Sequence, residues 1–160
     1  MWRQFLNNPE GRNVGDCSVR AISKALDVDW DTAYLLITAE GFCAKDMPSS
    51  DSIWGNVLRQ NGFYRSVIPN SCPECYTAED FCRDHPKGIY VLGFGGHVAT
   101  VVDGILYDSW NSSQEIPVYV WVKKGTSHGI QFSSRLSALL SKFLRLIHAA
   151  AEYGTTASAE

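Results

Sequence analysis

The sequence predicts an α+β fold, with N-terminal helices packed on an antiparallel sheet and a further helix at the C-terminal end. Apolar residues recur at helical spacing before residue 60 and again after residue 133. The stretch between residues 89 and 123 instead carries runs of Val, Ile, Tyr and Trp of strand length. With 160 residues, 45% of them hydrophobic and 19% charged, the chain has the size and composition of one globular domain.

Most of the predicted helices have a start or stop signal of their own. Residues 1–15 are expected to form an irregular arm, after which Asp16 begins the first helix as a typical N-cap residue. Gly41 is expected to stop the second helix. Thr77 and Asp80 have the spacing of a capping box, with Asp in place of Glu or Gln. Helices are predicted from residue 16, and over 29–40, 52–60, 77–85 and 134–151.

The strands are read from apolar and aromatic runs that lie between turn residues. Asp103-Gly104 separates two such runs and is a strong signal for a two-residue β-hairpin turn. Strands are predicted over 63–68, 89–94, 97–102, 105–110 and 118–123. We therefore expect one domain over 1–133, then a helix over 134–152 and a disordered polar tail over 153–160. The last helix either packs on the domain or offers its apolar face to a protein partner.

The charge, the apolar segments and the cysteines of the chain limit its expected partners and its expected location. A net charge of −3 without a basic block argues against a nucleic acid partner. No apolar run approaches the roughly 20 residues that cross a bilayer, and residues 1–8 are not apolar enough for a signal peptide. We therefore expect a cytoplasmic protein with no membrane partner. Its five cysteines cannot all pair, so in a reducing compartment they serve as thiols, metal ligands or a nucleophile.

Cys17 has the setting of a thiol nucleophile. It follows Gly15 and Asp16, so it occupies the first turn of the predicted helix. The unpaired N–H groups and the positive end of the helix dipole stabilise a thiolate there, which lowers a cysteine pKa from about 8.5 toward neutrality. The same N–H groups can hold an oxyanion. The alternative is a buried cysteine that packs as a small apolar residue, so a second group is needed to decide.

His97 and Asp108 are brought together by the predicted hairpin. A two-residue turn at Asp103-Gly104 pairs residue 99 with Asp108. Because side chains alternate along a strand, His97 shares a face with residue 99, and Asp108 lies on the diagonal from His97. A carboxylate there can fix the imidazole tautomer and leave the other ring nitrogen for the thiol. Asn111, at the end of the same strand, is an alternative orienting residue.

Three segments of the chain resemble papain-like cysteine peptidases of the compact bacterial and bacteriophage type: residues 13–22, 88–92 and 96–110. The resemblance implies a papain-like fold. It implies hydrolysis of a peptide, isopeptide or related amide bond through a thioester intermediate, with no cofactor required for catalysis. It also implies a protein or peptide substrate, and a place in the cytoplasm of a bacterium or of a phage-infected host cell.

The resemblance carries over onto individual residues. Cys17, His97 and Asp108 correspond to the nucleophile, the base and the orienting residue of the family's triad. The family's oxyanion glutamine is missing at its usual distance. Asn13 can take its place because its amide can donate a hydrogen bond, and the alternative is that Asn13 is a plain loop residue. The helix start is also similar to that of bacterial cell-wall peptidases, except that Val19 stands where they have Gly. A cell-wall peptide hydrolase and a catalytically inactive binding or regulatory domain are therefore the alternatives.

A second cluster of cysteines has spacing that suits a metal. The pattern C-x2-C-x6-C-x2-H permits a tetrahedral structural zinc site with three thiolates and one imidazole. The alternative is that the third cysteine is a core residue, the histidine ends a helix and the first two cysteines belong to a loop. The candidate ligands are Cys72, Cys75, Cys82 and His85.

Overall fold

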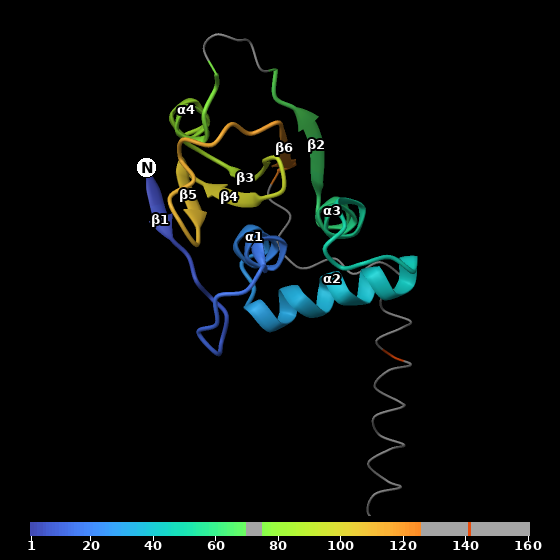
Figure 1. Ribbon diagram of the computed structural model, residues 1–160. Helices are drawn as coiled ribbons and strands as arrows, with labels where there is room; N and C mark the ends of the chain where they lie inside the picture. The colour runs from blue at the N-terminus through green and yellow to red at the C-terminus, as the bar shows by residue number, and fades with distance from the viewer. Residues whose placement is uncertain (70–74, 126–140, 142–160) are drawn as a thin grey trace, which may run out of the picture.

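The computed structural model describes residues 1–69, 75–125 and 141. In this part of the chain, α1, α2 and α3 lie on one side of a six-stranded sheet and α4 lies on the other (Figure 1). The helices are α1 (Cys17–Leu26), α2 (Trp30–Ala44), α3 (Asp51–Gln60) and α4 (Ala78–Asp84). The strands are β1 (Trp2–Gln4), β2 (Phe63–Val67), β3 (Ile89–Gly93), β4 (Val98–Val102), β5 (Ile105–Asp108) and β6 (Tyr119–Lys123).

The predicted α+β class is confirmed, and the sheet differs from the prediction in one respect. Its strand order is β1-β5-β4-β3-β6-β2, and every neighbouring pair is antiparallel except β1 and β5. The expectation of an irregular arm over residues 1–15 was wrong at its start, because Trp2 pairs with Leu106 and Gln4 with Asp108 in a parallel ladder. The sheet is therefore mixed. A strand of three residues is too short to show a period of two in its sequence.

The hairpin between β4 and β5 follows the prediction. Asp103 and Gly104 have φ angles of 48° and 74°, both positive as a type I′ turn requires. Val102 pairs with Ile105, and Thr100 pairs with Tyr107. If this register is continued beyond the paired residues, residue 99 lies opposite Asp108. This is the end of the two strands at which the candidate site lies.

The helix boundaries agree with the local signals except at Gly41. The capping box at Thr77 and Asp80 is confirmed in α4. The expectation that Gly41 stops α2 was wrong, because the helix continues to Ala44 and ends at Lys45, whose φ is 59°. A Cβ atom on Gly41 would lie 2.8 Å from the backbone oxygen of Asp46. Glycine is required at this position because the backbone after α2 passes close to it, and not because the helix ends there.

Two apolar layers hold the sheet between the helices. The layer on the side of α1, α2 and α3 contains Ile22, Leu58 and Trp121, each no more than 2% exposed. The layer on the side of α4 contains Phe81 and Leu92. Burying one such side chain stabilises the fold by about 1.5–3 kcal/mol relative to leaving it in water. The first layer fixes α1 across β4, which sets the position of the helix start relative to the hairpin.

Two predictions fall outside the described residues. These are the helix over 134–152, apart from Ser141, and the disordered tail over 153–160. Within the described residues, no helix is both long and apolar enough to cross a bilayer.

Candidate active site

Cys17 is the first residue of α1. The first backbone hydrogen bond of the helix runs from the N–H of Arg20 to the carbonyl of Asp16, 2.9 Å apart, so the Cys17 N–H precedes the helical ladder. The thiol is half-buried. Its hydrogen bond with His97 lowers its pKa against the opposing effect of burial, and the positive charge of His97 and the N–H groups of Val98 and Ser18 lower it further. These contacts favour a thiolate.

His97 is held by the tight turn between β3 and β4. The N–H of Phe94 donates to the carbonyl of His97 at 2.8 Å, and Gly96 has a φ of 112°, which favours glycine. The imidazole contacts two aromatic rings, at centroid distances of 5.9 Å from Phe94 and 5.6 Å from Trp110. The turn and the two rings together fix the orientation of the imidazole.

The imidazole of His97 makes two functional contacts. Nε2 lies 2.6 Å from Oδ2 of Asp108, which leaves Nδ1 for the hydrogen bond with Cys17. Burial alone would lower the pKa of His97, but its hydrogen bonds with Asp108 and Cys17 and their charges raise it to about 9. The His97 pKa is thus raised while the Cys17 pKa is lowered, and both shifts favour the charged forms of the two side chains.

Asp108 is the last residue of β5 and is 2% exposed. Besides His97, its Oδ2 atom accepts from the hydroxyl of Ser112 at 2.5 Å. Its Oδ1 atom accepts from the N–H of Ser109 at 2.7 Å. A buried carboxylate with this many donors is held in a single orientation.

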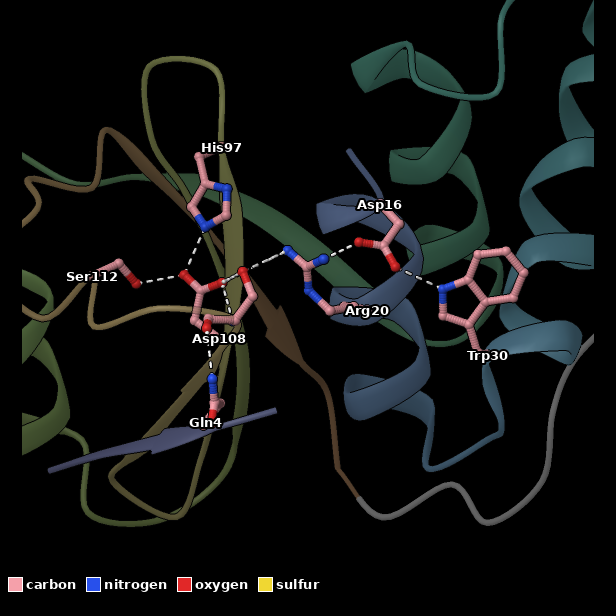
Figure 2. Close-up of polar contacts among 8 residues, drawn as sticks. Gln4, Asp16, Arg20, Trp30, His97, Asp108 and Ser112 are labelled. Carbon is pink, nitrogen blue, oxygen red and sulfur yellow. Dashed lines mark hydrogen bonds and ion pairs between the residues drawn. The ribbon is translucent and has the colours of Figure 1, made fainter. Parts of the chain in front are cut away.

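Behind Asp108 lies a buried cation, Arg20, shown in Figure 2. One amino group of its guanidinium donates to the Ser109 hydroxyl at 3.0 Å and lies 3.9 Å from Oδ1 of Asp108. The other pairs with the carboxylate of Asp16. Asp16 also accepts from Nε1 of Trp30 at 2.8 Å. Asp16 occupies the N-cap position as predicted, but its side chain makes no cap hydrogen bond because it is committed to Arg20 and Trp30.

Tyr119 is the first residue of β6 and pairs with Gly93 at the end of β3. Its ring crosses the position where a Cβ atom of Gly93 would be, and its hydroxyl donates to Asp51 at 3.1 Å. Burial raises the pKa of Tyr119 to about 12, helped by the negative charges of Asp51 and Cys17. The guanidinium of Arg65 lies 3.9 Å from the centre of the ring. The Tyr119 side chain is therefore a neutral phenol near pH 7.

The structure brings together three of the predicted site residues, Cys17, His97 and Asp108. The alternative orienting residue, Asn111, is exposed and accepts from the N–H of Ser113 at 3.2 Å, so Asp108 holds the place beside the imidazole. Asn13 lies exposed in the loop before α1, and its role as an oxyanion donor stays a prediction.

Sequence reasoning missed Arg20, Ser112 and Tyr119. Arg20 stands four residues after Asp16, a spacing that usually marks an exposed ion pair. Arg20 is only 7% exposed, and the sequence pattern does not reveal this burial. Ser112 lies in a loop and carries no sequence signal. The sequence pattern around Tyr119 predicts only a strand.

The predicted zinc ligands do not form a complete set among the described residues. Cys72 lies outside them, and Cys75 is exposed. Cys82 is 3% exposed in the apolar layer under α4, where burial raises the pKa of its thiol. His85 stacks on Phe81 at 4.0 Å, and its Nδ1 lies 3.0 Å from the carbonyl of Phe81. No three Cys, His, Asp or Glu side chains of residues 1–69 and 75–125 cluster as metal ligands, and zinc stays a prediction.

A cavity of about 690 Å³ lies on the α4 side of the sheet, lined among others by Tyr64, Phe81 and Val120. It contains none of the residues around Cys17, so the reactive groups and this cavity are separate features. No family model, curated protein or solved structure matches the chain, and the candidate site rests on its own geometry.

Proposed function

We propose that the protein is a papain-like cysteine hydrolase that cleaves a peptide, isopeptide or related amide bond. One observation carries the proposal: the imidazole of His97 is bonded through Nε2 to the buried Asp108 and also interacts with the Cys17 thiol. This is the arrangement that activates a nucleophile and orients its base. The position of Cys17 at the start of α1 adds the positive end of the helix dipole.

The ion pair of Cys17 and His97 would perform both halves of the reaction. The thiolate sulfur adds to the carbonyl carbon, and the C=O electron pair moves onto oxygen. When the tetrahedral intermediate collapses, the C–N bond breaks and His97 gives its proton to the leaving amine. The neutral imidazole then takes a proton from water as the water oxygen attacks the thioester. The C–S bond breaks, which restores the thiolate and the imidazolium. An amine in place of water gives acyl transfer.

The oxyanion of the intermediate needs donors near the sulfur. The N–H of Cys17 precedes the first hydrogen bond of α1 and is suited to this role. Asn13, in the loop before the helix, is the proposed second donor. A polypeptide is the proposed substrate, with no cofactor required for catalysis.

The alternative of a papain-like domain without turnover is less well supported. Such a domain has no use for a lowered thiol pKa at Cys17 or for an imidazole held between Asp108 and the sulfur. Shifted pKa values of this kind cluster at catalytic sites. No feature of the described residues favours a cell-wall substrate over another polypeptide.

The test is the rate at which iodoacetamide alkylates each cysteine, followed by mass spectrometry at several pH values. We expect Cys17 to react fastest near neutral pH, and His97→Ala to slow it about tenfold for each unit by which the thiol pKa rises. His85→Ala is the matched control, because His85 contacts Phe81 and not Cys17, and it should leave the rate unchanged. If Cys17 reacts no faster than the exposed Cys75 in the wild-type protein, the proposal fails.

Turnover is tested separately with a mixture of unfolded polypeptides. The wild-type protein should generate new N-termini, detected by mass spectrometry, and Cys17→Ala should generate none. Cleavage that survives Cys17→Ala would come from a contaminant or another site and would contradict the assignment of the nucleophile.

A further inference from the structure

We infer that Arg20 is a positioning residue that acts on the thiol through Asp108. It places a positive charge beside the buried Asp108 carboxylate and joins α1, which carries Cys17, to the end of β5, which carries Asp108 (Figure 2). The inference rests on the proposed function, since it concerns how the same site is kept in its reactive state.

The contacts of Arg20 connect two elements far apart in the sequence. Arg20 lies one turn after Cys17 on α1, and its guanidinium reaches both Ser109 and Asp108 at the end of β5. The opposite side of the guanidinium pairs with Asp16, the residue immediately before Cys17. One planar group with several donors thus contacts both ends of the site, which a lysine ammonium cannot do.

The burial of these charges makes the guanidinium necessary. Asp16 is 6% exposed and Asp108 2%, and both are negative in the reactive state. Without Arg20, Asp16 would keep the neutral donor of Trp30 and Asp108 would keep His97 as a charged partner. Burial favours the protonated form of a carboxylate that lacks a counter-charge. A neutral Asp108 no longer stabilises the imidazolium, and the thiolate then loses its counter-charge.

A surface pair on α4 provides the contrast. Arg83 and Asp80 are three residues apart on one helix, as Arg20 and Asp16 are four apart, but the Arg83 side chain is 68% exposed. Exposed pairs of this kind contribute little, because water and salt screen them. We therefore attribute the influence of Arg20 on the site to its burial beside Asp108, and not to the helical spacing of its ion pair with Asp16.

The experiment measures the Cys17 alkylation rate against pH in the wild-type protein and in four single variants. Arg20→Met should raise the pH midpoint of the rate and slow alkylation at pH 6 by about tenfold for each unit by which the midpoint rises. Arg20→Lys should give a midpoint between the two. Asp16→Asn removes a negative charge beside the thiol and should lower the midpoint. Arg83→Met is the matched control and should keep the wild-type profile.

The directions separate an electrostatic role from a purely structural one. If the Asp16–Arg20 pair only held the helix in place, Arg20→Met and Asp16→Asn would both raise the midpoint, and Arg20→Lys would not restore it. Circular dichroism checks that each variant is folded. If Arg20→Met does not fold, the opposite shifts of Arg20→Lys and Asp16→Asn carry the test.

The result also distinguishes this inference from the proposed function. A wild-type Cys17 that titrates as an ordinary thiol overturns the proposed function. A wild-type Cys17 with a low midpoint that is unchanged in folded Arg20→Met leaves the proposed function standing and overturns the role of Arg20.

Discussion

A Cβ atom placed on Gly93 would lie 2.0 Å from Cζ of Tyr119. Glycine at the end of β3 is therefore what allows the Tyr119 ring to lie across the strand and reach Asp51 with its hydroxyl. Gly93 pairs with Tyr119 of β6 on one side of β3 and with Val98 of β4 on the other. This pairing shapes the wall of the site beside Cys17.

Gly93→Ala should displace the Tyr119 ring. Because the ring is 6% exposed and has little room to move, we expect a loss of about 1–3 kcal/mol in the free energy of unfolding, measured with urea. Gly95→Ala is the matched control, because a Cβ atom there meets nothing within 4 Å, and its effect should stay within about 0.5 kcal/mol. Equal stabilities for the two variants would contradict the close contact between Gly93 and Tyr119.

Ser112→Ala should remove a hydrogen bond that holds the Asp108 carboxylate beside His97. The Ser112 hydroxyl is fully buried and donates to Asp108 at 2.5 Å, and a hydrogen bond to a charged group contributes about 1.5–3 kcal/mol. We expect a loss of that size in unfolding free energy and a slower alkylation of Cys17 at neutral pH. Ser113→Ala is the control, because the described hydrogen bonds of Ser113 run through its backbone. A normal alkylation rate in folded Ser112→Ala would show that this contact does not tune the imidazole.

Hydrolysis should have a falling alkaline limb set by His97. The imidazolium donates the proton to the leaving amine, and it is the dominant form below its raised pKa of about 9. The rate of peptide cleavage should therefore decline as the pH rises through about 9, whereas alkylation of Cys17, which needs no acid, should not decline there. Parallel profiles for the two reactions would exclude His97 as the acid.

Gly41→Ala should destabilise the protein although it lies inside a helix. Alanine gains about 1 kcal/mol over glycine from helix propensity, but its Cβ atom would approach the backbone oxygen of Asp46 at 2.8 Å. A backbone atom cannot give way as a side chain can, so we expect a net loss of about 1–3 kcal/mol in urea unfolding. A stabilised variant would mean that the chain after α2 moves freely.

The parts of the fold that were predictable have local causes. Asp103-Gly104 sets the hairpin register, because both residues accept positive φ, and the register in turn places His97 and Asp108 on one face. The capping box at Thr77 likewise marks the start of α4 without help from the rest of the chain.

The parts that were not predictable depend on distant contacts. Strand β1 exists only because β5 offers it a parallel edge, and Gly41 is required by a neighbouring loop. Arg20 is buried because Asp16 and the end of β5 surround it, a circumstance that no residue near it in the sequence reveals. The sequence thus indicated the three residues of the candidate site but not the buried guanidinium of Arg20 beside them.

The most direct test of the central claim is an NMR titration of the His97 ring in the wild-type protein and in Cys17→Ala. If a thiolate and Asp108 both hold the imidazolium, the wild-type ring should stay protonated at neutral pH and titrate near 9, and the pKa should fall when the sulfur is removed. A wild-type ring that titrates near its ordinary value of 6.5 and does not respond to Cys17→Ala would contradict the ion pair.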